Sequence, residues 1–193
     1  AGGERVLQGY MRGALPAGRG RDDAPTYLYA KDYEAQVAVW RRSDSGTLLR
    51  SLWGGNVSMP RALYARAEDS LPSERLEYNE DLDLGMRLLQ LGAAATFVEH
   101  ARAAHHHSRG LRAYVEECQA RGRAVADLEK RWGERPAQLT AVVTIPSSFN
   151  RVLRAVQRRV AAHDTGGATQ AGLAAAYRVS GIVRAFRLQD GVA

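Results

Sequence analysis

The sequence is poor in cysteine, aromatic residues and long apolar runs. Cys118 is its only cysteine, which excludes an internal disulfide framework and fits a reducing, cytoplasmic location. The longest strongly apolar run, residues 139–145, is far shorter than the roughly 20 residues that a membrane-crossing helix needs. No transmembrane helix is therefore expected within these residues. Because the sequence opens AGGERVLQGY, without methionine and almost directly in a strand-like run, we also expect natural residues upstream.

Charge is unevenly distributed along the 193 residues. Residues 1–100 carry 12 basic and 14 acidic side chains, whereas residues 101–193 carry 15 basic and 7 acidic ones. The net charges of the two parts are therefore −2 and +8. A hydrophobic content of 45% is typical of a globular chain. The asymmetry indicates a catalytic portion followed by a basic appendage that meets anionic material.

The pattern of apolar residues predicts alternating strands and helices in the first part of the chain, which is the α/β class. The predicted elements are a strand at 5–10, a helix at 27–42, one or two strands within 48–59, a helix that begins near residue 80, short strands at 96–99 and 102–106, and helices at 111–132, 149–160 and 173–186. Inward-facing stripes are expected at Tyr33, Val37 and Trp40 and at Leu84, Leu88 and Leu91.

The stretch EYNEDLDLGMRLLQLG, residues 77–92, places four acids around the start of a leucine-rich helix. Asn79 is expected to cap this helix, and Gly92 to end it. Glu80, Asp81 and Asp83 then occupy its first turn, where unpaired backbone amides and the helix dipole stabilise carboxylates. Helix-start electrostatics without chemistry is one interpretation of this cluster. A positioned carboxylate that acts as a general base is the other.

Three motifs in sequence resemble the carboxyl-terminal half of the catalytic domain of glycosyltransferase family two. They are WGGNVSMPR, then YNEDLDLGMRLLQLGA, then FVEHARAAHHHSRGLRAYVEE. Members of this family are inverting nucleotide-sugar enzymes with the GT-A fold, which is Rossmann-like with a mixed sheet. The resemblance covers about residues 47–125 by motif. It implies a partial GT-A domain at 1–132 on the acceptor side, followed by a basic extension of amphipathic helices at 133–193.

The resemblance implies roles for individual residues. Asp81 matches the catalytic base, and Glu80 matches its partner, which helps to place the acceptor. Gly54, Gly55 and Asn56 match an element that lines the donor and acceptor cleft. Two further residues join the predicted substrate contacts: Trp53, whose ring could stack on a sugar, and Asp83, for which support of the helix start is the alternative.

A metal ion is also implied by the resemblance. His105 aligns with a histidine that helps some GT-A enzymes bind the divalent metal or the diphosphate, and His107 would share its side of an extended strand. A structural histidine without a ligand role is the alternative. The cofactor would be Mg²⁺ or Mn²⁺. Its main aspartate-x-aspartate ligands, like the nucleotide-binding half, are not seen in this sequence, which therefore resembles a fragment.

The implied partners are a nucleotide-sugar donor and a hydroxyl acceptor that is a carbohydrate, lipid-linked or of another kind. The basic carboxyl-terminal helices could lie on an anionic membrane surface, giving peripheral contact with the inner face of the membrane. The alternative is that their apolar stripes pack on the catalytic portion or on a partner and that the arginines are solvated. A non-enzymatic module that binds nucleic acid is the alternative from another class, but few aromatic residues alternate with the arginines, so no nucleic acid is predicted. A metal-dependent hydrolase would need tighter spacing of its ligands.

Overall fold

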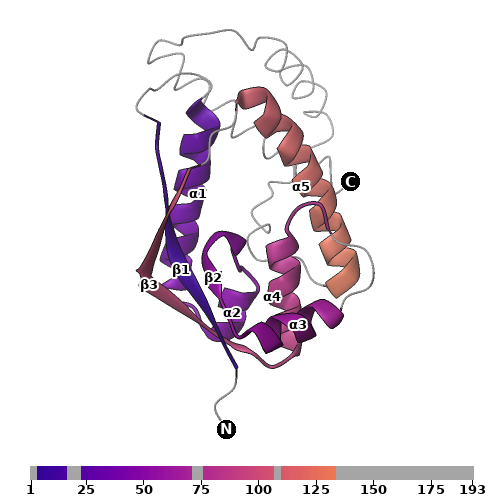
Figure 1. Ribbon diagram of the computed structural model, residues 1–193. Helices are drawn as coiled ribbons and strands as arrows, with labels where there is room; N and C mark the ends of the chain where they lie inside the picture. Colours follow the sequence, from indigo (N-terminus) through magenta and orange to yellow (C-terminus); the bar gives the residue numbers. More distant parts are fainter. Residues whose placement is uncertain (1–3, 17–22, 71–75, 107–109, 134–193) are drawn as a thin grey trace. The chain divides into compact units, whose positions relative to one another are not determined.

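The computed structural model describes residues 4–16, 23–70, 76–106 and 110–133 and shows a mixed α/β chain (Figure 1). The described parts of Ala1–Arg12, Tyr33–His105 and Asp127–Thr140 form one compact unit, and those of Gly13–Asp32 and His106–Ala126 form another. None of the helices in the described part of the chain is long and apolar enough to cross a membrane. The helices predicted at 149–160 and 173–186 lie outside the described residues.

The first unit is built on a three-stranded mixed sheet in the order β2-β1-β3. Its strands are β1 (Arg5–Gly13), β2 (Val57–Ser58) and β3 (Ala94–His105). β1 pairs antiparallel with β2, with Leu7 opposite Ser58 and Gln8 opposite Val57. Val6 and Gln8 point inward at alternate positions, as the two-residue period of a strand requires, and Met11, three residues further, is also buried.

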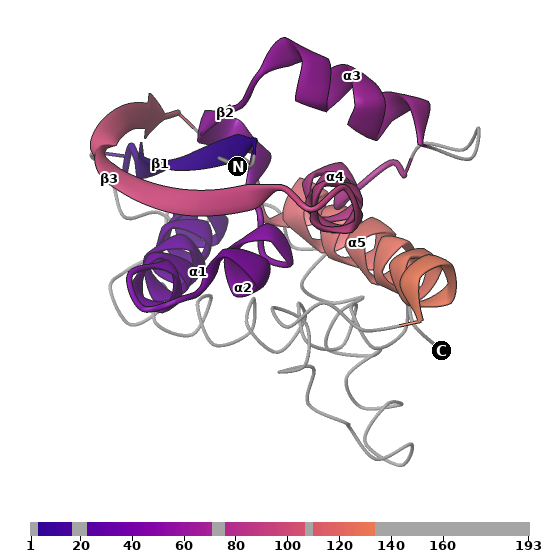
Figure 2. The same cartoon turned by 90° about the horizontal axis from the view of Figure 1, so that it is seen from below.

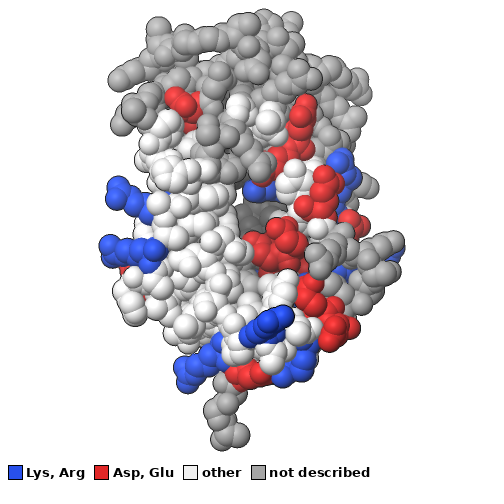
Figure 3. All heavy atoms as spheres, in the orientation of Figure 1, with Lys and Arg blue, Asp and Glu red and all other residues white. Residues whose placement is uncertain are grey.

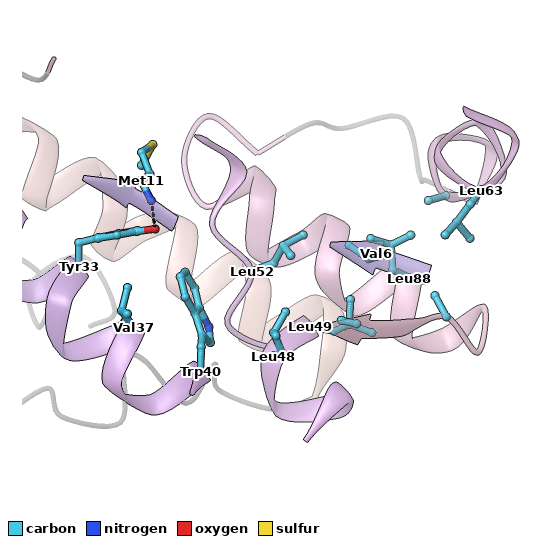
Figure 4. Packing of buried hydrophobic residues seen from close by; sticks show 13 residues of the cluster. Val6, Met11, Tyr33, Val37, Trp40, Leu48, Leu49, Leu52, Leu63 and Leu88 are labelled. Carbon is cyan, nitrogen blue, oxygen red and sulfur yellow. Dashed lines mark hydrogen bonds between the residues drawn. The ribbon is translucent and has the colours of Figure 1, made fainter. Parts of the chain in front are cut away.

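Helices complete this unit and supply most of its core. They are the Tyr33–Trp40 part of α1 (Ala24–Trp40), α2 (Ser45–Leu49), α3 (Arg61–Asp69), α4 (Glu80–Gln90) and the last turns of α5 (Leu111–Trp132). Figure 2 shows α1 and α2 on one face of the sheet. The stripe predicted in α1 is confirmed, because Tyr33, Val37 and Trp40 are all buried (Figure 4).

Two buried hydrogen bonds satisfy the polar atoms of this aromatic stripe. The hydroxyl of Tyr33 accepts from the backbone N–H of Met11 at 2.7 Å (Figure 4). The indole Nε1 of Trp40 donates to Oγ of Ser51 at 2.8 Å. Buried polar atoms without such partners would cost about 1 to 3 kcal/mol each. The core therefore keeps its aromatic residues without a polar penalty.

The strands predicted within 48–59 are mostly wrong. The segment forms α2 and a 3₁₀ turn, Gly54–Asn56, and only Val57–Ser58 is extended. Asp44 explains the difference, since its side chain accepts a hydrogen bond from the backbone N–H of Thr47 at 2.7 Å and caps α2. The two short strands predicted at 96–99 and 102–106 are one continuous strand, β3, and His106 lies beyond its end.

Helix α4 has the predicted extent, but its buried face differs from the predicted stripe. Leu88 is fully buried, whereas Leu91 is 36% exposed and lies just past the end of the helix. The buried face instead combines apolar and charged residues: Leu82, Asp83, Gly85, Met86, Arg87 and Leu88. Gly92 ends the helix as predicted, with a φ of 72° and a hydrogen bond from its N–H to the carbonyl of Leu89 at 3.0 Å.

Gly85 lets α4 pack directly on the backbone of α2. A Cβ atom at this position would overlap the carbonyl oxygen of Leu49 and lie 3.2 Å from Cβ of Leu52. Neither neighbour is the end of a flexible side chain, so the two helices would have to separate. The contact between α2 and α4 therefore requires glycine.

Replacement of Gly85 by alanine should lower the free energy of unfolding by at least about 2 kcal/mol, because the new methyl group meets rigid backbone. Gly110→Ala is the matched control: an added Cβ there has no heavy atom within 4 Å, and its cost should stay below about 1 kcal/mol. Urea unfolding of both variants measures the difference. Equal stabilities would contradict the close packing.

Acid should weaken the cap of α2. The backbone N–H of Thr47 hydrogen-bonds the carboxylate of Asp44 and lowers the pKa of Asp44 below its ordinary value. With the folded pKa below the unfolded value of about 3.9, the stabilisation is complete above that pH and is lost as pH falls through the folded pKa. Asp44→Asn keeps an acceptor but does not titrate. The melting temperatures of the two chains should therefore converge as the pH is lowered from about 5 to about 2, a range that brackets the unfolded pKa. A constant difference would refute the cap.

Candidate functional site

The start of α4 is formed differently from the sequence prediction. Asn79 is at the N-cap position, but its backbone is left-handed, with a φ of 62°, and its side chain makes no capping hydrogen bond. Asparagine is among the few residues other than glycine that adopt this conformation readily. The capping role predicted for Asn79 is therefore wrong, and its backbone conformation instead turns the chain into the helix. Glu80, Asp81 and Asp83 do occupy the first turn.

The carboxylate of Asp81 lies against the Gly-Gly-Asn turn. Its Oδ2 accepts a hydrogen bond from the backbone N–H of Gly54 at 3.0 Å, and its Oδ1 accepts one from the N–H of Leu82 at 2.9 Å. The side chain is half-buried. Two backbone donors thus fix the plane of the carboxylate, as expected for a group that has to be held in one orientation.

Gly54 and Gly55 make room for this approach. A Cβ on Gly54 would lie 3.3 Å from Cβ of Asp81, and one on Gly55 would overlap Sδ of Met11 in β1. The turn is therefore confined between the first turn of α4 and the sheet. Glycine at these positions keeps the backbone close enough for its N–H to reach Asp81.

Asn56 holds the turn to the sheet through its side-chain amide. Nδ2 donates to the carbonyl of Tyr10 at 3.1 Å and to the carbonyl of Ala101 at 2.9 Å, which joins the turn to β1 and β3. These contacts support the geometry of the site from within. The substrate contact predicted for Asn56 stays a prediction.

Gln8 completes this support, and the sequence analysis missed it. The side chain is 1% exposed; its Oε1 accepts from the backbone N–H of Trp53 at 3.0 Å, and its Nε2 donates to the carbonyl of Asn56 at 3.2 Å. The two ends of the turn are thus bound to one buried amide. A polar residue at an inward position of a predicted strand, between Val6 and Tyr10, was the available signal.

Trp53 belongs partly to the core. Its ring meets that of Tyr33 edge to face, with centroids 5.0 Å apart and an interplanar angle of 82°. The side chain is half-buried, so Tyr33 fixes the orientation of the indole beside the turn. Stacking of this ring on a sugar stays a prediction.

Asp83 and Glu80 lie in different environments although they share a helical turn. Glu80 is exposed, whereas Asp83 is 3% exposed and its carboxylate is bound by Arg131 and Trp132 of α5 and by Arg87 of α4. The structure thus separates the acids of the motif into surface and buried groups. Figure 3 shows acidic side chains gathered over α3 and α4 on one face of the molecule.

His105 lies at the end of β3 and is half-buried. Among the residues that the structure describes, no group of three or more His, Cys, Asp or Glu side chains is arranged to hold a metal ion. The described residues therefore do not by themselves form a complete site for Mg²⁺ or Mn²⁺, which prefer several oxygen ligands. His107 lies outside the described residues. The metal contact of His105 stays a prediction.

Comparisons with known proteins give no match: no family model, no curated protein and no solved structure is significantly similar to this chain. The arrangement of the residues themselves is therefore the basis for any function.

The amide of Asn56 offers a test of this arrangement. Asn56→Ala removes two partly exposed hydrogen bonds and should lower the free energy of unfolding by about 1 to 2 kcal/mol. Asn56→Asp has the same shape but turns a carboxylate towards two carbonyl oxygens, so it should cost more than alanine at pH 7. Its deficit should shrink as pH falls and the new carboxyl is protonated. Urea unfolding across pH measures both effects, and an aspartate variant as stable as the parent would show that the amide contacts are absent.

Proposed function

We propose that this chain is the acceptor side of an inverting glycosyltransferase that resembles family two and has the GT-A fold. The proposal rests on the order of the three motifs in the sequence. One observation supports it most directly: the carboxylate of Asp81 is hydrogen-bonded to Gly54, so the acid of the second motif and the turn of the first form one site. A helix start with electrostatics alone does not require that contact.

The proposed reaction is a single displacement at the anomeric carbon of the donor sugar. An acceptor hydroxyl attacks this carbon, Asp81 takes the hydroxyl proton, and the bond to the nucleoside diphosphate breaks on the opposite face. Configuration at the carbon is therefore inverted. Since general base catalysis needs the carboxylate within hydrogen-bond reach of the hydroxyl, the two N–H donors that orient Asp81 serve this step.

The exposed Glu80, next to Asp81, is suited to hold the acceptor at the entrance of the site. Its carboxylate lies at the surface on the same helical turn. Hydroxyl groups of a carbohydrate or of a lipid-linked acceptor donate hydrogen bonds to such a group. We therefore propose that Glu80 orients the acceptor, while the turn beside Asp81 contacts the sugar.

The divalent metal, Mg²⁺ or Mn²⁺, would offset the charge that develops on the leaving diphosphate. By the resemblance, its principal ligands would belong to a nucleotide-binding half that is not seen in this sequence. The described residues contribute at most a histidine, His105, to such a site. Donor binding would accordingly need that half as well.

The basic residues of 133–193 give the second part of the proposal, which concerns partners. Residues 133–193 carry 8 basic and 3 acidic side chains, a net charge of +5, and contact with the anionic inner face of a membrane would bring the site to a lipid-linked acceptor. The structure does not describe 134–193, so this part rests on the sequence. Flotation of the chain with vesicles that contain anionic lipid, but not with neutral vesicles, is the expected result.

Asp81→Asn tests the catalytic role. The amide keeps an oxygen that can accept from Gly54, but it cannot take a proton, so turnover should fall by about 10²-fold to 10⁴-fold with an unchanged melting temperature. The measurement is release of nucleoside diphosphate from a panel of nucleotide-sugars by the full-length protein.

Glu99→Gln is the matched control, because it neutralises an exposed carboxylate of β3 that pairs with Arg41. Its turnover should stay within a factor of about two of the parent, as for a surface ion pair of little energetic weight. Near-normal transfer by Asp81→Asn would refute the base. Salt-dependent binding of random DNA without any donor turnover would favour a nucleic-acid-binding module instead.

A further inference from the structure

A group of four charged side chains, two of them buried, lies beside the acidic start of α4. Asp83 is 3% exposed, and its Oδ1 accepts from Nη1 of Arg131 at 3.0 Å and from the indole Nε1 of Trp132 at 2.9 Å. Its Oδ2 lies 3.3 Å from Nε of Arg87. Oδ1 is therefore hydrogen-bonded by the last turn of α5, whereas Oδ2 forms an ion pair with Arg87 of α4 in which Nε makes no hydrogen bond.

Arg87 connects Asp83 to α3. The guanidinium is 5% exposed, and its Nη1 donates to the carbonyl of Ala67 at 2.6 Å and to Oε1 of Glu68 at 3.2 Å. The two carboxylates, Asp83 and Glu68, and the two guanidiniums, Arg87 and Arg131, are formally neutral together. Such a group is tolerated away from water only when every charge keeps its partners, because a single unpaired buried charge is very costly.

This group is connected to Asp81 through one helical turn. The backbone N–H of Asp83 donates to the carbonyl of Asn79 at 3.1 Å, which closes the turn that contains Asp81. Gly85, two residues further, packs against Leu49 of α2. The contacts of the Asp83 side chain thus restrain the first turn of α4, both in its rotation about the helix axis and in its position along that axis. Asp81 reaches Gly54 from this turn.

We propose that Asp83 is a positioning residue: bound by Arg131 and Trp132 at the end of α5, it holds the first turn of α4 so that the carboxylate of Asp81 stays hydrogen-bonded to Gly54. A substrate contact through Asp83 is not needed in this proposal, since its oxygens face the protein interior. A buried ion pair contributes little to stability compared with an apolar packing of the same volume, but it does specify one geometry. The catalytic consequence rests on the function proposed for Asp81, whereas the geometric consequence does not.

The geometric consequence can be measured on the 193-residue chain without any substrate. Trp132→Phe keeps an aromatic ring and deletes one N–H donor, and Asp83→Asn keeps the shape and deletes the charge. In both variants the amide proton of Gly54 should exchange with solvent on the order of tenfold faster, relative to amides of β1, because its acceptor is no longer held in place. The melting temperature, followed alongside, reports the global fold.

Two comparisons separate positioning from a general loss of stability. Glu99→Gln breaks the exposed pair with Arg41 and should leave the exchange of Gly54 unchanged. Arg131→Lys keeps a positive charge near Asp83 and should restore part of the protection that Arg131→Met removes. If Asp83→Asn does not fold, Trp132→Phe and the Arg131 pair of variants decide the matter.

Kinetics on the full-length protein give the second readout. The same variants should lower kcat on the order of tenfold with little change in the KM for the donor, because only the placement of the base is affected. Unchanged exchange of Gly54 in folded Trp132→Phe would overturn the positioning role. Faster exchange together with full activity of Asp81→Asn would support the positioning role and refute the function proposed for Asp81.

Discussion

The close packing of α4 on α2 at Gly85 is the constraint on which the rest of the site depends. With no side chain at this position, α4 lies directly on the backbone of Leu49. A helix held at that distance presents its first turn to the chain segment that follows α2. The hydrogen bond between Asp81 and Gly54, 27 residues apart in sequence, is a consequence of that approach.

The turn at Gly54–Asn56, which hydrogen-bonds Asp81, is also held in place by the sheet. Gln8 of β1 binds both ends of the turn, and the side-chain amide of Asn56 donates to backbone carbonyls of β1 and β3. These are buried or half-buried polar groups, and each is paired with the backbone. Backbone carbonyls and N–H groups hold the turn in one place more tightly than apolar packing alone, which tolerates sliding.

Polar residues therefore have two different tasks in this unit. Gln8, Asn56, Asp83 and Arg87 face inward and set geometry, whereas Glu80 is exposed and Asp81 lies between the two groups at half burial. The proposed transferase function uses Glu80 and Asp81, and it requires the inward-facing residues to hold them in place. A chemical group that must be placed to within a fraction of an ångström needs support of this kind behind it.

Several features of the fold followed from the sequence because they depend on local pattern. The three-residue and four-residue spacing of Tyr33, Val37 and Trp40 predicted a buried helical face, and Gly92 predicted a helix end, since both effects arise within a few residues of chain. Local pattern failed at 48–59. There, three leucines fit a strand or a helix equally well, and the cap at Asp44 was the deciding signal.

The sequence alone determined the α/β class and the acids in the first turn of α4. Only the tertiary structure decided which acid faces the turn and which is buried, because successive residues of a helix point about 100° apart and the neighbours on each side come from distant segments. Arg131 and Trp132, nearly fifty positions after Asp83, could not be assigned to it from spacing. Contacts between residues so far apart in sequence depend on how the helices pack, and a short sequence motif does not contain that information.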